Sequence, residues 1–217
     1  MIRLYLIRHG RQESALCNVN VPLVKEGREQ AELCGKRLKK YHIQRLYSSN
    51  LIRAVETAQI INEQLKVPYE TYENLAEMDF GELTGLTDTE ICERFSDFVK
   101  ERNSVTNDVP FPGGESGRDV FDRAYPIIMD IVGKAEKENT ENIAIVTHGG
   151  LIRSVLAGFL GCGFENKLLF ARDLENCSIT QVDYNSANGK FYVERINDYA
   201  HIEEDEKLLR KYFKRSL

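Results

Sequence analysis

Cysteine is scarce in this sequence and shows no pairing pattern. There are five cysteines in 217 residues, an odd number without any C-x-x-C pair. This usage argues against the disulfide framework of small secreted proteins and against the paired-thiol motifs of redox and zinc-binding proteins. We therefore expect free thiols in a reducing cytoplasm, none of them a catalytic nucleophile. The cysteines are Cys17, Cys34, Cys92, Cys162 and Cys177.

Long apolar runs and an excess of positive charge are also missing. No run approaches the roughly 18 apolar residues of a membrane-spanning helix. The N-terminus enters a strand pattern directly, without the apolar core and cleavage site of a signal peptide. Lysine and arginine number 29 against 34 aspartates and glutamates, a net charge of −5. Nucleic-acid-binding proteins usually carry a basic face, so we expect neither a membrane nor a nucleic acid as partner.

Short apolar runs alternate with amphipathic segments along the chain. The short runs predict strands at 2–7, 43–49, 67–72, 142–147, 178–184 and 190–196. Apolar residues at spacings of three and four predict helices at 26–41, 51–65, 89–102, 118–139, 150–161 and 203–215. Pro68 favours a sheet edge for the third strand, and the turn sequence SANG predicts a hairpin between the last two.

This alternation predicts an α/β fold. We expect a three-layer α/β/α sandwich with a mostly parallel central sheet and an antiparallel C-terminal hairpin. A chain of 217 residues can bury a full core, so we expect a single domain over 1–217. The stretch 88–117 lies outside the strand–helix rhythm. We expect a helical and loop insertion there, over the end of the sheet that carries the candidate active site.

Two predicted strands end in histidine followed by glycine. Arg8, His9 and Gly10 end the first strand, and His148 and Gly149 follow the fourth. Ligands of open α/β sheets bind beyond the carboxyl ends of the strands. Glycine after each histidine lets the backbone turn sharply or approach a ligand closely. These residues are therefore expected to meet in one pocket.

The residue types suit a phosphoryl group. Arg8 and Arg53 offer forked donors for a tetrahedral dianion. Helix N-termini after Ser49 and Gly150 would add backbone N–H donors. A neutral imidazole can attack phosphorus, and a carboxyl group such as that of Glu77 can donate a proton to the leaving oxygen. Together these are the parts of phosphoryl transfer through a phosphohistidine.

Five ordered motifs carry a resemblance to a known family. They are LIRHG, SSNLIRAVETA, LAEMDFGELTG, PGGES and VTHGGLIR. The set resembles the histidine phosphatase superfamily, also called the phosphoglycerate mutase-like superfamily, over residues 2–202. The resemblance implies that His9 is the phosphorylated nucleophile, that Glu77 is the proton donor and acceptor, and that no metal or organic cofactor is needed. The residues that it places around the phosphate are Arg8, Arg53, Gly149 and the third catalytic residue, His148.

The stretch after RHG departs from the family's pattern. Arg11 and Gln12 stand where Glu and then Ser or Thr are common. Ala15 stands where an Asn often follows, and Asn18 comes later. This loop usually helps to hold the substrate. We interpret Arg11 as an additional anionic contact and Asn18 as a substrate contact.

Several further positions keep more than one interpretation. Glu77 and Asp79 compete for the acid role, and the family pattern favours Glu77. Glu115 is either structural or at the pocket edge, and Ser116 can be a helix N-cap. His201 resembles a late histidine of phosphatase members, or is a surface histidine.

The leading hypothesis is a cytoplasmic phosphomonoester hydrolase that acts on a small phosphorylated metabolite. The alternative within the family is a 2,3-bisphosphoglycerate-dependent phosphoglycerate mutase. Gly150 stands where mutases often carry Asn, and the loop 11–19 looks shortened, which favours water as acceptor. A zinc hydrolase with His9, His148 and Glu77 as ligands is a different class, disfavoured by the adjacent arginines. A non-catalytic phospho-ligand module is the third class, disfavoured because every expected catalytic position is filled.

Overall fold

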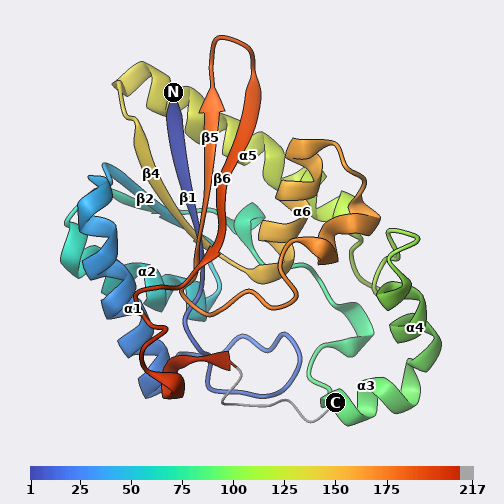
Figure 1. The fold of residues 1–217 in the computed structure, drawn as a ribbon. Helices are drawn as coiled ribbons and strands as arrows, with labels where there is room; N and C mark the ends of the chain where they lie inside the picture. The colour runs from blue at the N-terminus through green and yellow to red at the C-terminus, as the bar shows by residue number, and fades with distance from the viewer. Residues whose placement is uncertain (211–217) are drawn as a thin grey trace.

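The protein has one six-stranded sheet between two helical layers. The computed structural model describes residues 1–210, and Figure 1 shows the arrangement. The strand order is β3-β2-β4-β1-β5-β6. The strands are β1 (Ile2–Arg8), β2 (Arg45–Ser48), β3 (Tyr69–Thr71), β4 (Asn142–Thr147), β5 (Ile179–Asn185) and β6 (Lys190–Asp198). The helices are α1 (Lys25–Leu38), α2 (Ile52–Leu65), α3 (Asp88–Arg94), α4 (Ser96–Ser104), α5 (Gly117–Glu138) and α6 (Gly149–Leu160).

The sheet is mostly parallel, as the sequence predicts. Strands β3, β2, β4 and β1 pair in parallel, whereas β5 pairs antiparallel with both β1 and β6. The predicted C-terminal hairpin is therefore confirmed, and β3 lies at an edge, where Pro68 precedes it. The carboxyl ends of β1, β2 and β4 consequently lie side by side, and this brings distant parts of the chain to one place.

Alternate residues of each central strand face the two helical layers. Leu4 and Leu6 of β1 pack in the core cluster that includes α5 and α6. Tyr5 and Ile7 pack in the cluster that includes α1 and α2. Both faces of a parallel sheet must be covered because successive side chains point to opposite sides, which explains the nearly continuous apolar run at 2–7. The three-layer α/β/α prediction is correct.

Two helix predictions differ from the structure. The helix expected at 89–102 is two short helices, with Phe95 as the residue between them. The described part of the helix expected at 203–215 consists of turns and a 3₁₀ turn at Glu206–Leu208; residues 211–215 lie outside the described chain. A mixed-charge run offers little apolar surface to hold an α-helix against a core. Within residues 1–210, no helix combines the length and apolar character needed to cross a bilayer.

Helices α3 and α4 lie away from the sheet, near the carboxyl ends of its strands (Figure 1). Aromatic rings join this part of the chain to the rest. The ring of Phe98 in α4 lies 5.0 Å from that of Phe111, which stacks at 4.4 Å on Phe80. The aromatic cluster therefore fixes α4 against the loop that carries Glu77.

Candidate active site

His9 is buried directly beyond the end of β1. Its side chain is 4% exposed, and its backbone N–H donates to the carbonyl of Thr147 on the neighbouring strand at 2.9 Å. The ring Nδ1 lies 2.7 Å from the carbonyl oxygen of Gly10. A carbonyl can only accept, so Nδ1 carries the proton and Nε2 keeps its lone pair. The sheet therefore holds His9 in the tautomer that a nucleophile requires.

The surroundings of His9 also keep its ring neutral. Burial is the largest effect, and the guanidiniums of Arg53 and Arg8 add to it, holding the pKa of His9 well below its usual range. A protonated imidazole has no lone pair at Nε2. The low pKa thus preserves the nucleophilic form at neutral pH.

Close backbone packing fixes the turn after His9. A Cβ atom on Gly10 would lie 2.5 Å from the carbonyl oxygen of Gly27 in the first turn of α1. The N–H of Gly10 donates to Thr57 Oγ1 at 2.9 Å, and Asn176 Nδ2 donates to the carbonyl of His9 at 2.9 Å. Gly27 is needed for the same packing, because a Cβ atom there would lie 2.2 Å from the carbonyl oxygen of Arg11.

His148 lies beside His9 at the end of β4. The two ring centroids are 5.0 Å apart. Ser49 Oγ and His148 Nε2 are 2.7 Å apart, whereas His148 Nδ1 is buried without a hydrogen-bond partner among residues 1–210. Burial first, then His9 and the arginines, holds the pKa of His148 well below its usual range. A neutral His148 whose other nitrogen has no partner suits a ligand contact better than a core role.

Arg53 is almost completely buried, with 1% of the residue exposed. Its guanidinium donates to the carbonyl of Val19 at 3.1 Å and to Asn18 Oδ1 at 3.0 Å, while Nε has no partner among residues 1–210. Asn18 Nδ2 in turn donates to the carbonyl of Met78 at 3.1 Å. Asn18 was interpreted as a substrate contact. Both ends of its amide have partners within the protein, so it links Arg53 to the loop after Glu77. Asn18 also lines the pocket that includes His9, and its contact with the substrate stays a prediction.

Glu77 rests on the N-terminus of α6. Its carboxylate accepts the N–H groups of Gly150 at 3.3 Å and Leu151 at 3.2 Å, in addition to that of Met78 at 2.9 Å. The helix dipole and the free N–H groups favour a carboxylate there. We expected this N–H array and that of α2 to face the phosphate. The expectation was wrong for these amides, because α6 binds Glu77 and the N–H of Ile52 donates to Asn20 Oδ1 at 2.9 Å.

The contact between Glu77 and Gly150 gives a testable prediction. A Cβ atom on Gly150 would lie 2.6 Å from Glu77 Oε1, so the Gly150→Ala variant must displace that carboxylate. We expect kcat/KM for phosphomonoesters to fall by about 100-fold, the usual effect of moving a reacting group by about 1 Å. The matched control is Gly133→Ala in α5, where a Cβ atom meets nothing within 4 Å. That variant should keep full activity; equal activity of both variants would contradict the placement of Glu77.

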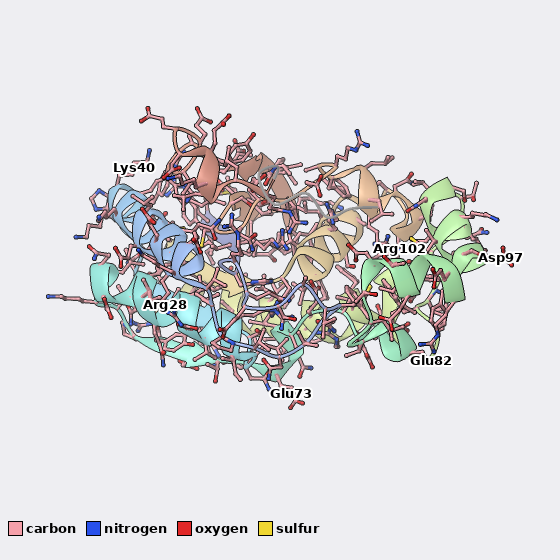
Figure 2. The ribbon with its side chains drawn as sticks, turned by 90° about the horizontal axis from the view of Figure 1, so that it is seen from below. Arg28, Lys40, Glu73, Glu82, Asp97 and Arg102 are labelled. Carbon is pink, nitrogen blue, oxygen red and sulfur yellow. The ribbon has the colours of Figure 1, made fainter. Side chains whose placement is uncertain are left out.

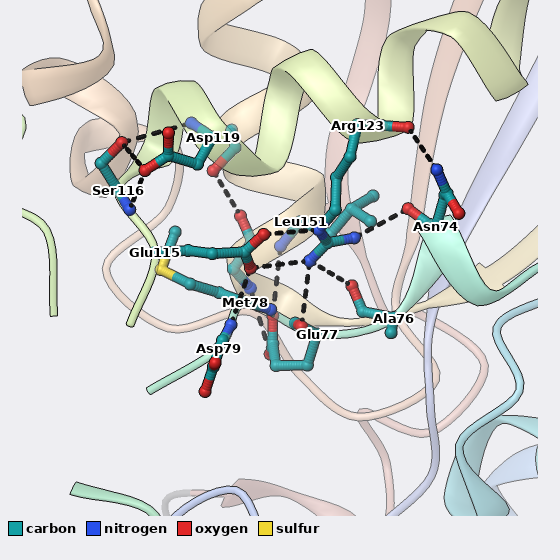
Figure 3. Close-up of polar contacts among 12 residues, drawn as sticks. Asn74, Ala76, Glu77, Met78, Asp79, Glu115, Ser116, Asp119, Arg123 and Leu151 are labelled. Atoms are coloured by element: carbon teal, nitrogen blue, oxygen red, sulfur yellow. Dashed lines mark hydrogen bonds and ion pairs between the residues drawn. The ribbon is translucent and has the colours of Figure 1, made fainter. Parts of the chain in front are cut away.

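A second carboxylate, that of Glu115, holds the loop that carries Glu77 in place (Figure 3). It accepts two hydrogen bonds from Arg123, at 2.7 and 3.0 Å, and the N–H of Asp79 at 2.8 Å. Arg123 also donates to the carbonyls of Ala76 and Glu77, each at 3.1 Å. Glu115 is therefore structural, which resolves the two interpretations, and the exposed Asp79 serves this brace.

Ser116 caps α5 as expected. Its hydroxyl oxygen accepts a hydrogen bond from the N–H of Asp119 at 3.2 Å, and the carboxylate of Asp119 accepts one from the N–H of Ser116 at 2.9 Å. This reciprocal pair fixes the start of α5 immediately after Glu115. The cap thus belongs to the frame of the site and not to its chemistry.

Arg11 turns toward the C-terminal part of the chain. Its guanidinium donates to the carbonyl of Lys207 at 3.1 Å, and its backbone N–H donates to Gln30 Oε1 at 2.9 Å. Arg11 also lines a cleft of about 650 Å³ that includes Arg8 and His9. Asn176, which sequence reasoning missed, lines the same cleft. No motif signals Asn176, because the backbone path between α6 and β5 brings it there.

His201 lies near Arg37, Asp198 and the backbone of Cys177. Burial, helped by the positive charge of Arg37, lowers its pKa to about 4. In the unfolded chain, His201 binds a proton with a pKa near 6.5, whereas in the folded chain it does so only near pH 4. The stabilisation from keeping this ring neutral is complete above pH 6.5 and decreases as the pH falls toward 4.

We accordingly predict that the free energy of unfolding depends on pH, and that His201→Gln weakens this pH dependence. Between pH 6.5 and 5.5, His201 should contribute a loss of up to about 1 kcal/mol in the free energy of unfolding. Urea unfolding at several pH values measures it. Identical pH dependence in the wild type and His201→Gln would contradict the buried, neutral state of this ring.

One pocket joins most of the predicted site residues, whereas His148 is fully buried beside His9 and is not part of the pocket wall. A volume of about 280 Å³ is lined by Arg8, His9, Arg53, Glu77 and Gly149 together with residues of α3, α4 and the loop after α6. Asp79 is absent from its wall, which favours Glu77 for the acid role. Among residues 1–210, no group of three or more His, Cys, Asp and Glu side chains is arranged to hold a metal ion. The zinc hypothesis is also disfavoured by the guanidiniums of Arg8 and Arg53, which line the same pocket and would repel a cation.

Known proteins share both the sequence pattern and the fold. A family model described as the histidine phosphatase superfamily (branch 1) matches residues 4–199. A 2,3-bisphosphoglycerate-dependent phosphoglycerate mutase of Cytophaga hutchinsonii is 33% identical over 162 residues, which cover 70% of this chain and 75% of that protein. A broad-specificity phosphatase of Saccharomyces cerevisiae is 29% identical over 216 residues, covering 95% and 90%.

Solved structures agree with this assignment. A mycobacterial glucosyl-3-phosphoglycerate phosphatase in complex with inorganic phosphate superposes with a TM-score of 0.83, at 26% identity, covering 93% of this chain and 99% of that one. The fold and the pocket define an α/β protein with a neutral histidine among arginines at the end of a parallel sheet. The chain belongs to the histidine phosphatase superfamily.

Proposed function

We propose that this protein is a phosphomonoester hydrolase that acts on a small phosphorylated metabolite through a phosphohistidine at His9. The state of His9 is the main support. Its Nδ1–H donates to the Gly10 carbonyl at 2.7 Å, and its low pKa keeps the ring neutral, so that Nε2 retains its lone pair. His9 lines the same pocket as Arg8 and Arg53. A pocket of about 280 Å³ fits a small substrate.

In the first step, Nε2 of His9 attacks phosphorus, and the bond from phosphorus to the leaving oxygen breaks. The Glu77 carboxyl group gives its proton to that oxygen, so that a neutral alcohol leaves. Arg8, Arg53 and His148 donate to the phosphoryl oxygens, where negative charge must be stabilised. The product is a phosphohistidine and a Glu77 carboxylate.

In the second step, water attacks the phosphohistidine while the Glu77 carboxylate takes a proton from it. The bond between phosphorus and Nε2 breaks, and inorganic phosphate forms. His9 returns to its neutral form and Glu77 to its protonated form. Glu77 serves both steps from one place because the N-terminus of α6 fixes its carboxylate.

A phosphoglycerate mutase is the second candidate, since one relative has that activity by name. Gly150 supports hydrolysis instead. A Cβ atom at this position would lie 2.6 Å from Glu77 Oε1, so the Asn that mutases often carry there would require the Glu77 side chain to shift. A cytoplasmic location belongs to the proposal as well, supported by the free thiols of all five cysteines.

One assay separates the two candidates. The protein is incubated with 3-phosphoglycerate and a trace of 2,3-bisphosphoglycerate, and both phosphate release and 2-phosphoglycerate formation are followed. A panel of other phosphomonoesters is assayed for phosphate release in parallel. We expect release to exceed isomerisation. Efficient formation of 2-phosphoglycerate, with negligible phosphate release from every substrate, would instead identify the protein as a mutase.

A further inference from the structure

The pocket extends past the phosphate ligands into a part with a different lining. Glu77, His9 and Arg53 lie at one part of its wall. The rest of the wall combines apolar and aromatic side chains with charged ones, and it comes from the loop after Glu77, from α3 and α4, and from the loop after α6. The apolar residues are Met78, Phe80, Leu83, Ile91, Phe98, Val99, Phe111, Leu168 and Leu174. A phosphate alone needs no such extension.

Arg102 of α4 enters this apolar part. Its guanidinium lies 5.4 Å from the ring centre of Phe111, and it lines the pocket. Figure 2 shows Arg102 on the inner side of the helical insertion, whereas Asp97 of the same helix lies at the outer edge of the molecule. The side chain is therefore directed toward the site and not toward solvent.

Arg102 has no anionic partner within the described chain. None of the ion pairs among residues 1–210 includes it, and its buried Nε lacks a hydrogen-bond acceptor. Burial lowers its pKa, which reflects the cost of holding a cation out of water. The nearby Lys167 shows the contrast. It lines the same pocket, and it is paired with Asp108 at 2.5 Å.

Arg153 of α6 adds a second cation to this wall. Its NH2 group donates to the carbonyls of Ala171 at 2.9 Å and Arg172 at 3.1 Å, which fixes the guanidinium without neutralising its charge. Its Nε has no partner, and it forms no ion pair within residues 1–210. Two arginines that form no ion pair within residues 1–210 thus share one pocket wall with the phosphate ligands. The carboxylates of that wall are Glu77, which accepts N–H groups of α6, Asp173, which pairs with Arg210, and Asp88.

We propose that the pocket selects phosphomonoesters that carry a second anionic group, bound by Arg102 and Arg153, while the phosphate to be transferred lies at His9. Forked guanidinium donors recognise carboxylates and phosphates alike, and a desolvated guanidinium gains most from such a partner. The aromatic wall then contacts the body of the substrate. This inference rests on the proposed phosphatase activity and names the class of its substrate.

Matched substrate pairs test the inference. Phosphoserine and phosphoethanolamine differ by one carboxylate, as do 3-phosphoglycerate and glycerol 3-phosphate. The bisphosphate and the monophosphate of 1,3-propanediol differ by a phosphate. The pairs distinguish a carboxylate from a phosphate as the second anion. In the wild type we expect the doubly anionic member of at least one pair to have a kcat/KM at least about tenfold higher.

The variant Arg102→Gln removes the charge and keeps a side chain of similar polarity. We expect kcat/KM for the preferred doubly anionic substrate to fall by about 10- to 100-fold, mainly through KM, as for the loss of a charged hydrogen bond. The singly anionic partner should change by less than about threefold. Lys100→Gln is the control, since it makes the same charge change at an exposed position of α4.

The outcomes are distinct. The proposal that Arg102 and Arg153 bind a second anion is supported if Arg102→Gln abolishes the preference for the doubly anionic substrate and Lys100→Gln preserves it. Equal losses on both members of a pair, or no preference in any pair of the wild type, overturn it while phosphate release continues. Absence of phosphate release from every substrate, in contrast, is a failure of the proposed function.

Discussion

Replacing His9 by asparagine is expected to lower kcat on every phosphomonoester by about 10⁴-fold or more. Loss of a nucleophile removes the covalent step itself, and effects of this size follow when such a residue is deleted. Asparagine keeps a polar side chain in the buried site, so the fold should survive. Steady-state phosphate release, with thermal unfolding as a check on folding, measures the effect.

The exposed His42 provides the matched control for this change. His42→Asn makes the same replacement far from the pocket, and it should retain wild-type turnover and KM. If His9→Asn kept turnover on any substrate within about tenfold of the wild type, the nucleophile would be another group. A loss in both variants would point to histidine replacement as such and not to the site.

The second large effect is expected for Glu77→Gln, and it should depend on the leaving group. General acid and base groups contribute about 10²- to 10⁴-fold, so kcat/KM for an alkyl phosphate should fall by that range. With 4-nitrophenyl phosphate the leaving oxygen needs no proton, and the loss in kcat/KM should be much smaller. Glutamine keeps an oxygen for the N–H groups of Met78 and Leu151 and loses only the acceptor for Gly150, the longest of the three hydrogen bonds at 3.3 Å.

Asp79→Asn is the control for Glu77, because Asp79 is the rival carboxylate in the same loop. Asp79 is exposed and absent from the pocket wall, so its variant should keep near wild-type kcat/KM on both substrates. The assignment would be reversed if Asp79→Asn showed the leaving-group dependence and Glu77→Gln did not. A uniform loss on both substrates in Glu77→Gln would indicate a role in binding instead.

The sequence predicts the position of those site residues that directly follow a strand. Apolar runs at 2–7 and 142–147 indicate two buried strands, and a parallel pairing of β1 and β4 places His9 and His148 together. The layer arrangement follows from the same periodicity. These predictions succeed because apolar runs and the alternation of strands with helices are local patterns that a single sequence displays.

The partners of the loop side chains are less visible in the sequence. Asn18 looks like a substrate contact, yet its amide bridges Arg53 and Met78. Glu77 occupies the N–H groups of α6, and no spacing rule in the sequence indicates this. Such contacts depend on how three separate loops pack on one another, which is a tertiary property. The unpaired charge of Arg102 belongs to the same category.

The stereochemical course at phosphorus tests the central claim most directly. A phosphomonoester made chiral with oxygen isotopes is supplied with an alcohol acceptor, and the configuration of the transferred phosphoryl group is determined. Two displacements, first at His9 and then at the phosphohistidine, each invert phosphorus, so we expect net retention. Net inversion would show direct attack by the acceptor on the substrate and would contradict the phosphohistidine mechanism.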